Sequence, residues 1–192
     1  SYDVILEIFE ISKKQGIRSV DKICHRMELG KDTYTLGKIR PEMEEELCRV
    51  LADFVRIMEG YRVDDYRATA SSAISEASNS LYVLGKIHQL TGFSVTVLSN
   101  SEQRFLSYKA LAAMEDNFNK IIEKGTAILD LDGGSFQISL FDKDALVTTQ
   151  NIRMGSLRIR ERLAGIQSET EHYEEMVEEL IWNEVSSFKK MY

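Results

Sequence analysis

The chain has 192 residues, of which 43% are hydrophobic and 29% are charged, and its formal net charge is −7. This composition indicates a globular chain that can bury one sizeable core or two small ones. The negative charge argues against a broad nucleic-acid-binding face, which needs clustered Lys and Arg. No apolar run approaches the roughly 18 residues that span a bilayer. We therefore expect neither a nucleic-acid partner nor a membrane partner.

Two cysteines, Cys24 and Cys48, stand far apart with no CxxC motif and no matching histidine spacing. This usage favours a reduced, cytoplasmic protein. The chain begins without Met and stops inside a helical pattern, so we expect a piece of a longer protein. The three histidines also lie far apart, with no spacing that would hold a metal.

Hydrophobic periodicity predicts an α/β chain. Strands are expected at residues 4–11, 17–29 (one or two strands), 66–69, 93–97, 126–131, 136–141 and 146–152. Helices are expected at residues 41–60, 80–90, 99–114, 153–163 and 168–192. Pro41 suits a first helical turn, and Leu81, Leu84 and Ile87 are predicted to share one face of the second helix. Ser99 and Glu102 have the S-x-x-E spacing of a capping box, which turns Glu102 toward its own backbone.

The segment AILDLDGGSFQISLF at residues 127–141 carries the strongest chemical signal. It predicts a buried strand, a turn at residues 132–135 and a return strand. Paired glycines let a backbone approach a ligand closely, and successive N–H groups form an anion nest. Asp130, at the end of the first strand, could hold a hydrated Mg²⁺ ion against a phosphate. An ordinary hairpin with a D-G-G turn is the alternative.

Five segments together resemble the exopolyphosphatase/guanosine pentaphosphate phosphatase family. They are SYDVILEIFEI, ATASSAISEASN, TGFSVTVLSNSEQRFLSYKAL, AILDLDGGSFQISLF and RMGSLRIRERL. The family motifs that they resemble include its first phosphate loop, A-T-S-A-x-R-E-A-x-N, S-G-x-E-E-A-R-L and a second phosphate loop, D-I-G-G-G-S-T-E. The order and spacing agree over essentially the whole chain.

The resemblance implies an actin-like (ribonuclease H-like) ATPase fold, with a mixed sheet flanked by helices. It places a first domain, lacking its first few residues, at 1–122 and the beginning of a second domain at 123–192. In this family a Mg²⁺-assisted water attacks the terminal phosphate of polyphosphate or pppGpp in the cleft between the domains. The implied partners are therefore polyphosphate or guanosine polyphosphate, with Mg²⁺ as cofactor and a homodimer as the assembly.

Candidate site residues are carried over position by position from the family motifs. Their roles are phosphate binding for Ser1, Ser75, Asp132, Gly133, Gly134 and Ser135, metal binding for Asp130, and catalysis for Gln103, Gln137 and Asp132. Several depart from the family pattern. Ser75 stands where the family has an arginine, Gln103 and Gln137 stand at carboxylate positions, and Asp132 replaces the first glycine of the second phosphate loop. Gly155 matches.

These departures bear on catalysis. A carboxylate can accept a proton from the attacking water and an amide cannot, although a glutamine can orient that water. Asp132 could bind Mg²⁺ or repel phosphate, and the sequence leaves both open. Three functions follow: an attenuated exopolyphosphatase-like phosphohydrolase, a non-catalytic sensor that binds polyphosphate or guanosine tetra- or pentaphosphate in the same cleft, and an actin-superfamily kinase.

Overall fold

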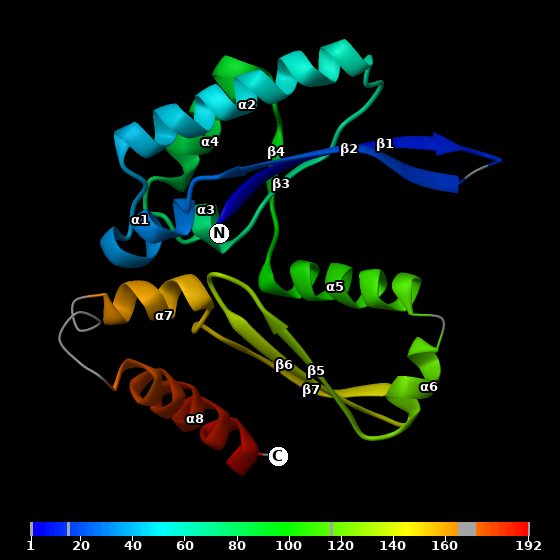
Figure 1. The fold of residues 1–192 in the computed structure, drawn as a ribbon, viewed down its shortest axis with the longest axis vertical. Helices are drawn as coiled ribbons and strands as arrows, with labels where there is room; N and C mark the ends of the chain where they lie inside the picture. The colour runs from blue at the N-terminus through cyan, green and yellow to red at the C-terminus, as the bar shows by residue number, and fades with distance from the viewer. Residues whose placement is uncertain (1, 15, 116, 165–171, 192) are drawn as a thin grey trace. The chain divides into compact units, whose positions relative to one another are not determined.

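Short groups of strands and helices follow one another along the chain, which is therefore an α/β protein (Figure 1). The computed structural model describes residues 2–14, 16–115, 117–164 and 172–191. The strands are β1 (Asp3–Ser12), β2 (Gly16–Arg26), β3 (Ala68–Ala70), β4 (Val95–Val97), β5 (Thr126–Leu131), β6 (Phe136–Asp142) and β7 (Ala145–Ile152). The helices are α1 (Leu29–Leu36), α2 (Pro41–Tyr61), α3 (Ser72–Ser75), α4 (Ser80–Thr91), α5 (Asn100–Met114), α6 (Phe118–Glu123), α7 (Ser156–Leu163) and α8 (Tyr173–Met191). Among the described residues, no helix is long and apolar enough to cross a bilayer.

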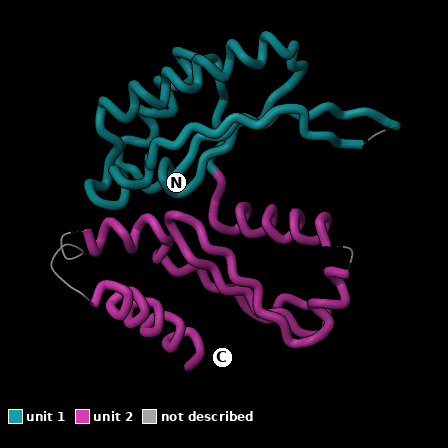
Figure 2. Tube along the Cα trace, viewed as in Figure 1, with its two compact units in different colours: residues 1–97 teal, residues 98–192 magenta. Residues whose placement is uncertain are grey.

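The chain divides into two compact units, residues 1–97 and residues 98–192 (Figure 2). This division assigns α5 and α6 to the second unit. The domain boundary expected from the family resemblance, at 122/123, would assign them to the first domain. That boundary concerns the division of the complete family fold and stays a prediction.

Unit 1 contains two separate two-stranded ladders and helices α1 to α4. β1 and β2 form an antiparallel hairpin, whereas β3 and β4 pair in parallel. Helix α2 starts with Pro41 in its first turn, as predicted. Its apolar face packs with α4 in a core that includes Leu47, Val83 and Ile87.

Two predictions for unit 1 are wrong in detail. Residues 27–29 do not continue the strand, because Glu28 has a left-handed backbone with φ 50° and Leu29 starts α1. The buried positions of Met27 and Leu29 in the core explain their apolar character. On α4, Leu81 is 84% exposed, and Val83 and Ile87 form the buried face instead.

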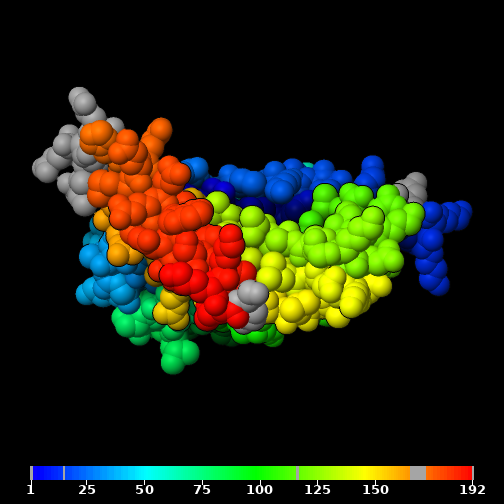
Figure 3. Space-filling view, turned by 90° about the horizontal axis from the view of Figure 1, so that it is seen from below, coloured from blue at the N-terminus to red at the C-terminus, as the bar shows by residue number. Residues whose placement is uncertain are grey.

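Unit 2 is built on an antiparallel sheet in the order β5-β6-β7. One face of this sheet packs Ile138 and Ile152 against residues of α7 and α8, including Ile159 and Phe188. Figure 1 shows α5 and α8 on opposite sides of the sheet. In the space-filling view, α8 lies on the outside of unit 2, coloured orange to red, beside strands coloured yellow (Figure 3).

Strand β5 is not the buried strand that the sequence predicts. It pairs only with β6, so it is an edge strand of the sheet in the described part of the chain. Leu129 and Leu131 are each 62% exposed. The continuous apolar run therefore predicted the strand correctly but not the exposure of its side chains.

Candidate functional site

A polar pocket of about 210 Å³ lies in unit 2 beside the turn at residues 132–135, which we call the phosphate loop. Every residue that lines the pocket is polar: Asn100, Gln103, Arg104, Ser107, Asp130, Asp132, Ser135, Gln137 and Asn151. Five of them are site residues predicted from the sequence. The pocket adds Asn100, Arg104, Ser107 and Asn151, which the sequence reasoning missed.

Strand register explains why three of these side chains converge. Asp130 on β5 is paired with Gln137 on β6, and Gln137 is paired with Asn151 on β7. Directly paired residues project on the same face of a sheet, so the three form one polar row across the strands. The register opposite Gln137 is the signal that could have identified Asn151, once the two hairpins were paired correctly.

Helix α5 supplies the other wall of the pocket through polar contacts. The hydroxyl of Ser107 donates to Oδ2 of Asp130 over 2.9 Å. Nη1 of Arg104 donates to Oγ1 of Thr149, also over 2.9 Å. One turn further along the helix, Tyr108 bonds Ser139 on β6 at 2.5 Å. The polar face of the sheet is thus matched by a polar face of α5, and the pocket lies between them.

The start of α5 is fixed by the predicted capping box. The Ser99 hydroxyl accepts from the N–H of Glu102, and the backbone N–H of Ser99 donates to the Glu102 carboxylate over 2.8 Å. That backbone bond, followed by the bond from the Ser99 hydroxyl, lowers the pKa of Glu102. Glu102 is therefore held in its ionised form by its own helix terminus, and it does not line the pocket beside Gln103.

Two sets of hydrogen bonds hold the phosphate loop, one from its own Asp132 side chain and one from the start of α7. Oδ1 of Asp132 accepts from the N–H groups of Gly134 and Ser135, over 2.5 Å and 2.9 Å. The carbonyls of Asp132 and Gly133 accept from the first N–H groups of α7, those of Ser156 and Arg158, over 2.9 Å and 3.1 Å. The loop therefore caps α7 in place of a side chain.

Gly155 permits this contact between loop and helix. A Cβ atom at this position would lie 2.4 Å from backbone atoms of Gly133, Gly134 and Ser135. Real Cβ atoms do not approach other atoms that closely. The match of Gly155 to the family pattern thus has a steric reason in this chain.

Several polar groups of the pocket remain open to a ligand. Gln103 donates Nε2 to the carbonyl of Leu98 over 3.2 Å, which leaves its amide oxygen available. Oδ1 of Asn151 is buried and has no hydrogen-bond partner among the described residues. An unpaired buried polar group costs about 1–3 kcal/mol, so water or a ligand in the pocket would stabilise this arrangement.

The donor set fits a hydrated Mg²⁺ ion better than a fully protein-bound metal. Asp130 and Asp132 supply two carboxylates, and the described residues contain no cluster of three or more His, Cys, Asp or Glu side chains able to hold a metal. Mg²⁺ commonly binds through one or two carboxylates and keeps several waters and phosphate oxygens as its other ligands.

The predicted site residue Ser75 belongs to unit 1 and is not among the residues that line this pocket. Ser75 is the exposed last residue of α3 in unit 1, and its N–H donates to the carbonyl of Ser71 over 3.1 Å. Ser1 lies outside the described residues.

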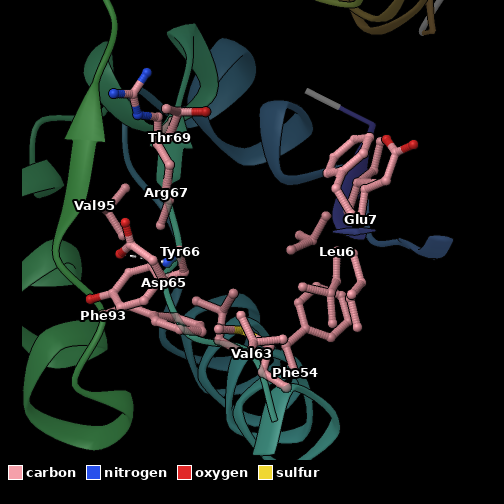
Figure 4. A pocket seen from close by; sticks show the side chains of 18 of the residues that line it. Leu6, Glu7, Phe54, Val63, Asp65, Tyr66, Arg67, Thr69, Phe93 and Val95 are labelled. Atoms are coloured by element: carbon pink, nitrogen blue, oxygen red, sulfur yellow. Dashed lines mark hydrogen bonds between the residues drawn. The ribbon is translucent and has the colours of Figure 1, made fainter. Parts of the chain in front are cut away.

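Unit 1 has a larger cavity, of about 1310 Å³, between β1 and β3 (Figure 4). Leu6 and Glu7 lie on one side and Thr69 on the other, with Phe54 and Val63 below. The two strands line the cavity, but β1 pairs with β2 and β3 pairs with β4. None of the predicted site residues that the structure describes lines it. The candidate site is therefore the pocket of unit 2.

Comparison with known proteins identifies the family of the chain. The sequence profile of the Ppx/GppA phosphatase family matches residues 7–192. Exopolyphosphatase 1 of Mycobacterium leprae is 29% identical over 108 residues, which cover 56% of this chain and 30% of that protein.

Solved structures show the same fold. The Aquifex aeolicus member of the Ppx/GppA family superposes with a TM-score of 0.69 and 21% identity, over 98% of this chain and 60% of its own. An exopolyphosphatase-like protein superposes with a TM-score of 0.77 and 19% identity, over 97% and 58%. The predicted α/β, actin-like ATPase fold is thus confirmed. This chain spans about 60% of the length of these structures and less than a third of the curated exopolyphosphatase.

Proposed function

This chain belongs to the Ppx/GppA phosphatase family, and on that premise we propose that it carries the phosphate site of an exopolyphosphatase-like phosphohydrolase. The substrate would be polyphosphate or pppGpp, and the reaction would release terminal phosphate with Mg²⁺ as cofactor. The observation that carries the proposal is the polar pocket of unit 2, whose lining includes Gln103, Asp130, Asp132, Ser135 and Gln137.

Asp130 and Arg104 have distinct proposed roles in the pocket. Asp130, oriented by the Ser107 hydroxyl at 2.9 Å, would hold the hydrated Mg²⁺ ion, which supplies charge neutralisation to the phosphates when bound. Arg104 is the only basic side chain among the pocket residues. Its hydrogen bonds to Thr149 and Ser101 use one N–H of each terminal nitrogen and leave the other N–H groups for a phosphate oxygen.

The amides at Gln103 and Gln137 predict a slow reaction. The free amide oxygen of Gln103 can accept a hydrogen bond from the attacking water and orient it, but it cannot take the proton. Loss of general-base help lowers rates by about 10²–10⁴-fold. We therefore expect measurable but attenuated phosphate release.

A non-catalytic sensor is the second candidate. The specific observation in its favour is that both family carboxylate positions carry amides, at Gln103 and Gln137, inside an otherwise complete polar pocket. Such a protein would bind polyphosphate or a guanosine polyphosphate without turnover.

A phosphate-release assay on the full-length protein separates these functions. Long-chain polyphosphate and pppGpp are supplied side by side with Mg²⁺, and binding of each is measured by calorimetry. The hydrolase predicts phosphate release that Asp130→Ala abolishes and that Gln103→Glu increases, whereas Asp142→Ala, at the exposed end of β6, leaves it unchanged. Binding without release identifies the sensor. The absence of both binding and phosphate release would overturn both functions.

Location and assembly are part of the proposal. Cys24 and Cys48 are both free thiols, which supports a reducing, cytoplasmic compartment. A homodimer is implied by the family alone, and light scattering of the full-length protein at several concentrations tests it.

A further inference from the structure

The phosphate loop contains an anionic side chain of its own, the carboxylate of Asp132. In the family pattern the position of Asp132 is a glycine, so the loop amides face whatever anion enters. Here Oδ1 of Asp132 accepts from the N–H groups of both Gly134 and Ser135. Those are the consecutive N–H groups on which a backbone anion nest depends.

We propose that the Asp132 carboxylate competes with phosphate for the N–H groups of Gly134 and Ser135 and so weakens phosphate binding to the loop. This inference rests on the proposed function, since it concerns the same pocket. An incoming phosphate must displace the carboxylate from two N–H groups and must also approach its negative charge. The first effect depends on the acceptor oxygen and the second on the charge, and the two can be separated by mutation.

The other contacts of the loop indicate that the carboxylate, rather than the loop backbone, is the part that moves. Gly133 and Gly134 are buried. The carbonyls of Asp132 and Gly133 are bonded to α7, and Gly155 packs directly against the loop backbone. Asp132 itself is exposed and lines the pocket. A rotation of one side chain would therefore free both N–H groups without rebuilding the loop.

The alternative reading of the sequence, that Asp132 merely repels phosphate, makes a different prediction. Asparagine at this position keeps an oxygen that can accept from both N–H groups and removes the charge. Alanine or glycine removes the charge and the acceptor together. If only charge mattered, all three substitutions would have the same effect on phosphate affinity.

The test uses the full-length protein with inorganic tripolyphosphate as the probe, measured by calorimetry with and without Mg²⁺. We expect Asp132→Asn to tighten binding only a few-fold and Asp132→Ala to tighten it at least tenfold beyond Asp132→Asn. Asp132→Gly, which restores the family residue, serves as the second acceptor-free variant if the alanine variant does not fold. Amide hydrogen exchange at Gly134 and Ser135 is followed in parallel, and protection should persist in Asp132→Asn and be lost in Asp132→Ala.

The outcomes separate this inference from the proposed function. If the wild type binds tripolyphosphate and Asp132→Ala binds it no more tightly than Asp132→Asn, the inference is overturned and the proposed function stands. If the wild type does not bind but the alanine or glycine variant does, the inference is supported and the native phosphohydrolase is not. Absence of binding in every variant overturns both. Unchanged exchange at Gly134 and Ser135 in Asp132→Ala would overturn the inference whatever the binding data.

Discussion

Replacement of Gly155 with alanine tests whether the phosphate loop is packed as tightly on α7 as the structure indicates. The new Cβ atom would lie 2.4 Å from three backbone atoms of the loop, whereas ordinary contact begins at 3.4 Å. The loop or the start of α7 must therefore move by about 1 Å, using the same contact limit. None of the three atoms belongs to a side chain that can rotate away.

Overpacking of this kind costs about 1–3 kcal/mol, and contact with rigid backbone places Gly155→Ala at the upper end. For a chain of this length, each 1 kcal/mol lowers Tm by roughly 2–4 °C, so the variant should melt roughly 6–12 °C below the wild type. A displaced loop should also weaken tripolyphosphate binding, since misplacement by about 1 Å can reduce activity 10²-fold.

The matched control is Gly85→Ala in α4, where a Cβ atom would meet nothing within 4 Å. Alanine is about 0.5–1 kcal/mol better than glycine inside a helix, so this variant should melt slightly above the wild type. Thermal unfolding by circular dichroism and calorimetric binding provide the two measurements. If Gly155→Ala melts and binds like the wild type, the close packing of loop and helix is refuted.

Three further predictions concern contacts in each unit. The pKa of Glu102 is lowered, so its capping contribution to stability is present above the ordinary carboxyl pKa of about 4.3 and disappears as the pH falls through the lowered value. Glu102→Gln should therefore be less stable than the wild type at neutral pH and equally stable in strong acid. Urea titrations at several pH values would show this. Ser107→Ala removes the hydroxyl bonded to Asp130 and should weaken Mg²⁺-dependent tripolyphosphate binding several-fold, whereas Ser187→Ala on α8, whose hydroxyl bonds its own helix, should not. Asp32 is 1% exposed and accepts from the backbone N–H and the guanidinium of Arg40, whose side chain is 50% exposed. Asp32→Ala should therefore lower the free energy of unfolding by about 1–3 kcal/mol, mainly because the Arg40 N–H loses its acceptor, and an unchanged free energy of unfolding would contradict this.

The sequence predicted secondary structure correctly where contacts between neighbouring residues determine it. The capping box at Ser99 and Glu102, the helix that begins at Pro41 and the hairpin around residues 132–135 all formed as predicted. Each depends on contacts between residues close in sequence, such as a side chain and the N–H three positions away. The same reasoning missed α1, because the apolar character of Met27, which precedes this helix, and of Leu29, its first residue, reflects packing in the core.

The candidate site divides in the same way. The sequence by itself identified Asp130, Gly133, Gly134 and Ser135 as a phosphate-loop pattern, because the chemistry of that turn is local. Arg104 and Asn151 could be found only once the strands were paired and α5 was laid across their polar face, since both reach the pocket from outside the loop.

Asp132 shows the limit most clearly. Its residue type allowed a metal ligand or a repelling charge, and the sequence could not choose between them. The tertiary structure decided where its carboxylate lies, on the N–H groups of Gly134 and Ser135, in a loop that α7 and Gly155 hold from the other side. The sequence by itself determined the family, the fold class and the position of the loop, because these follow from local pattern. Only the tertiary structure decided which residues from outside the loop reach the pocket and how α7 and Gly155 hold the loop, because those contacts join segments that are distant in sequence.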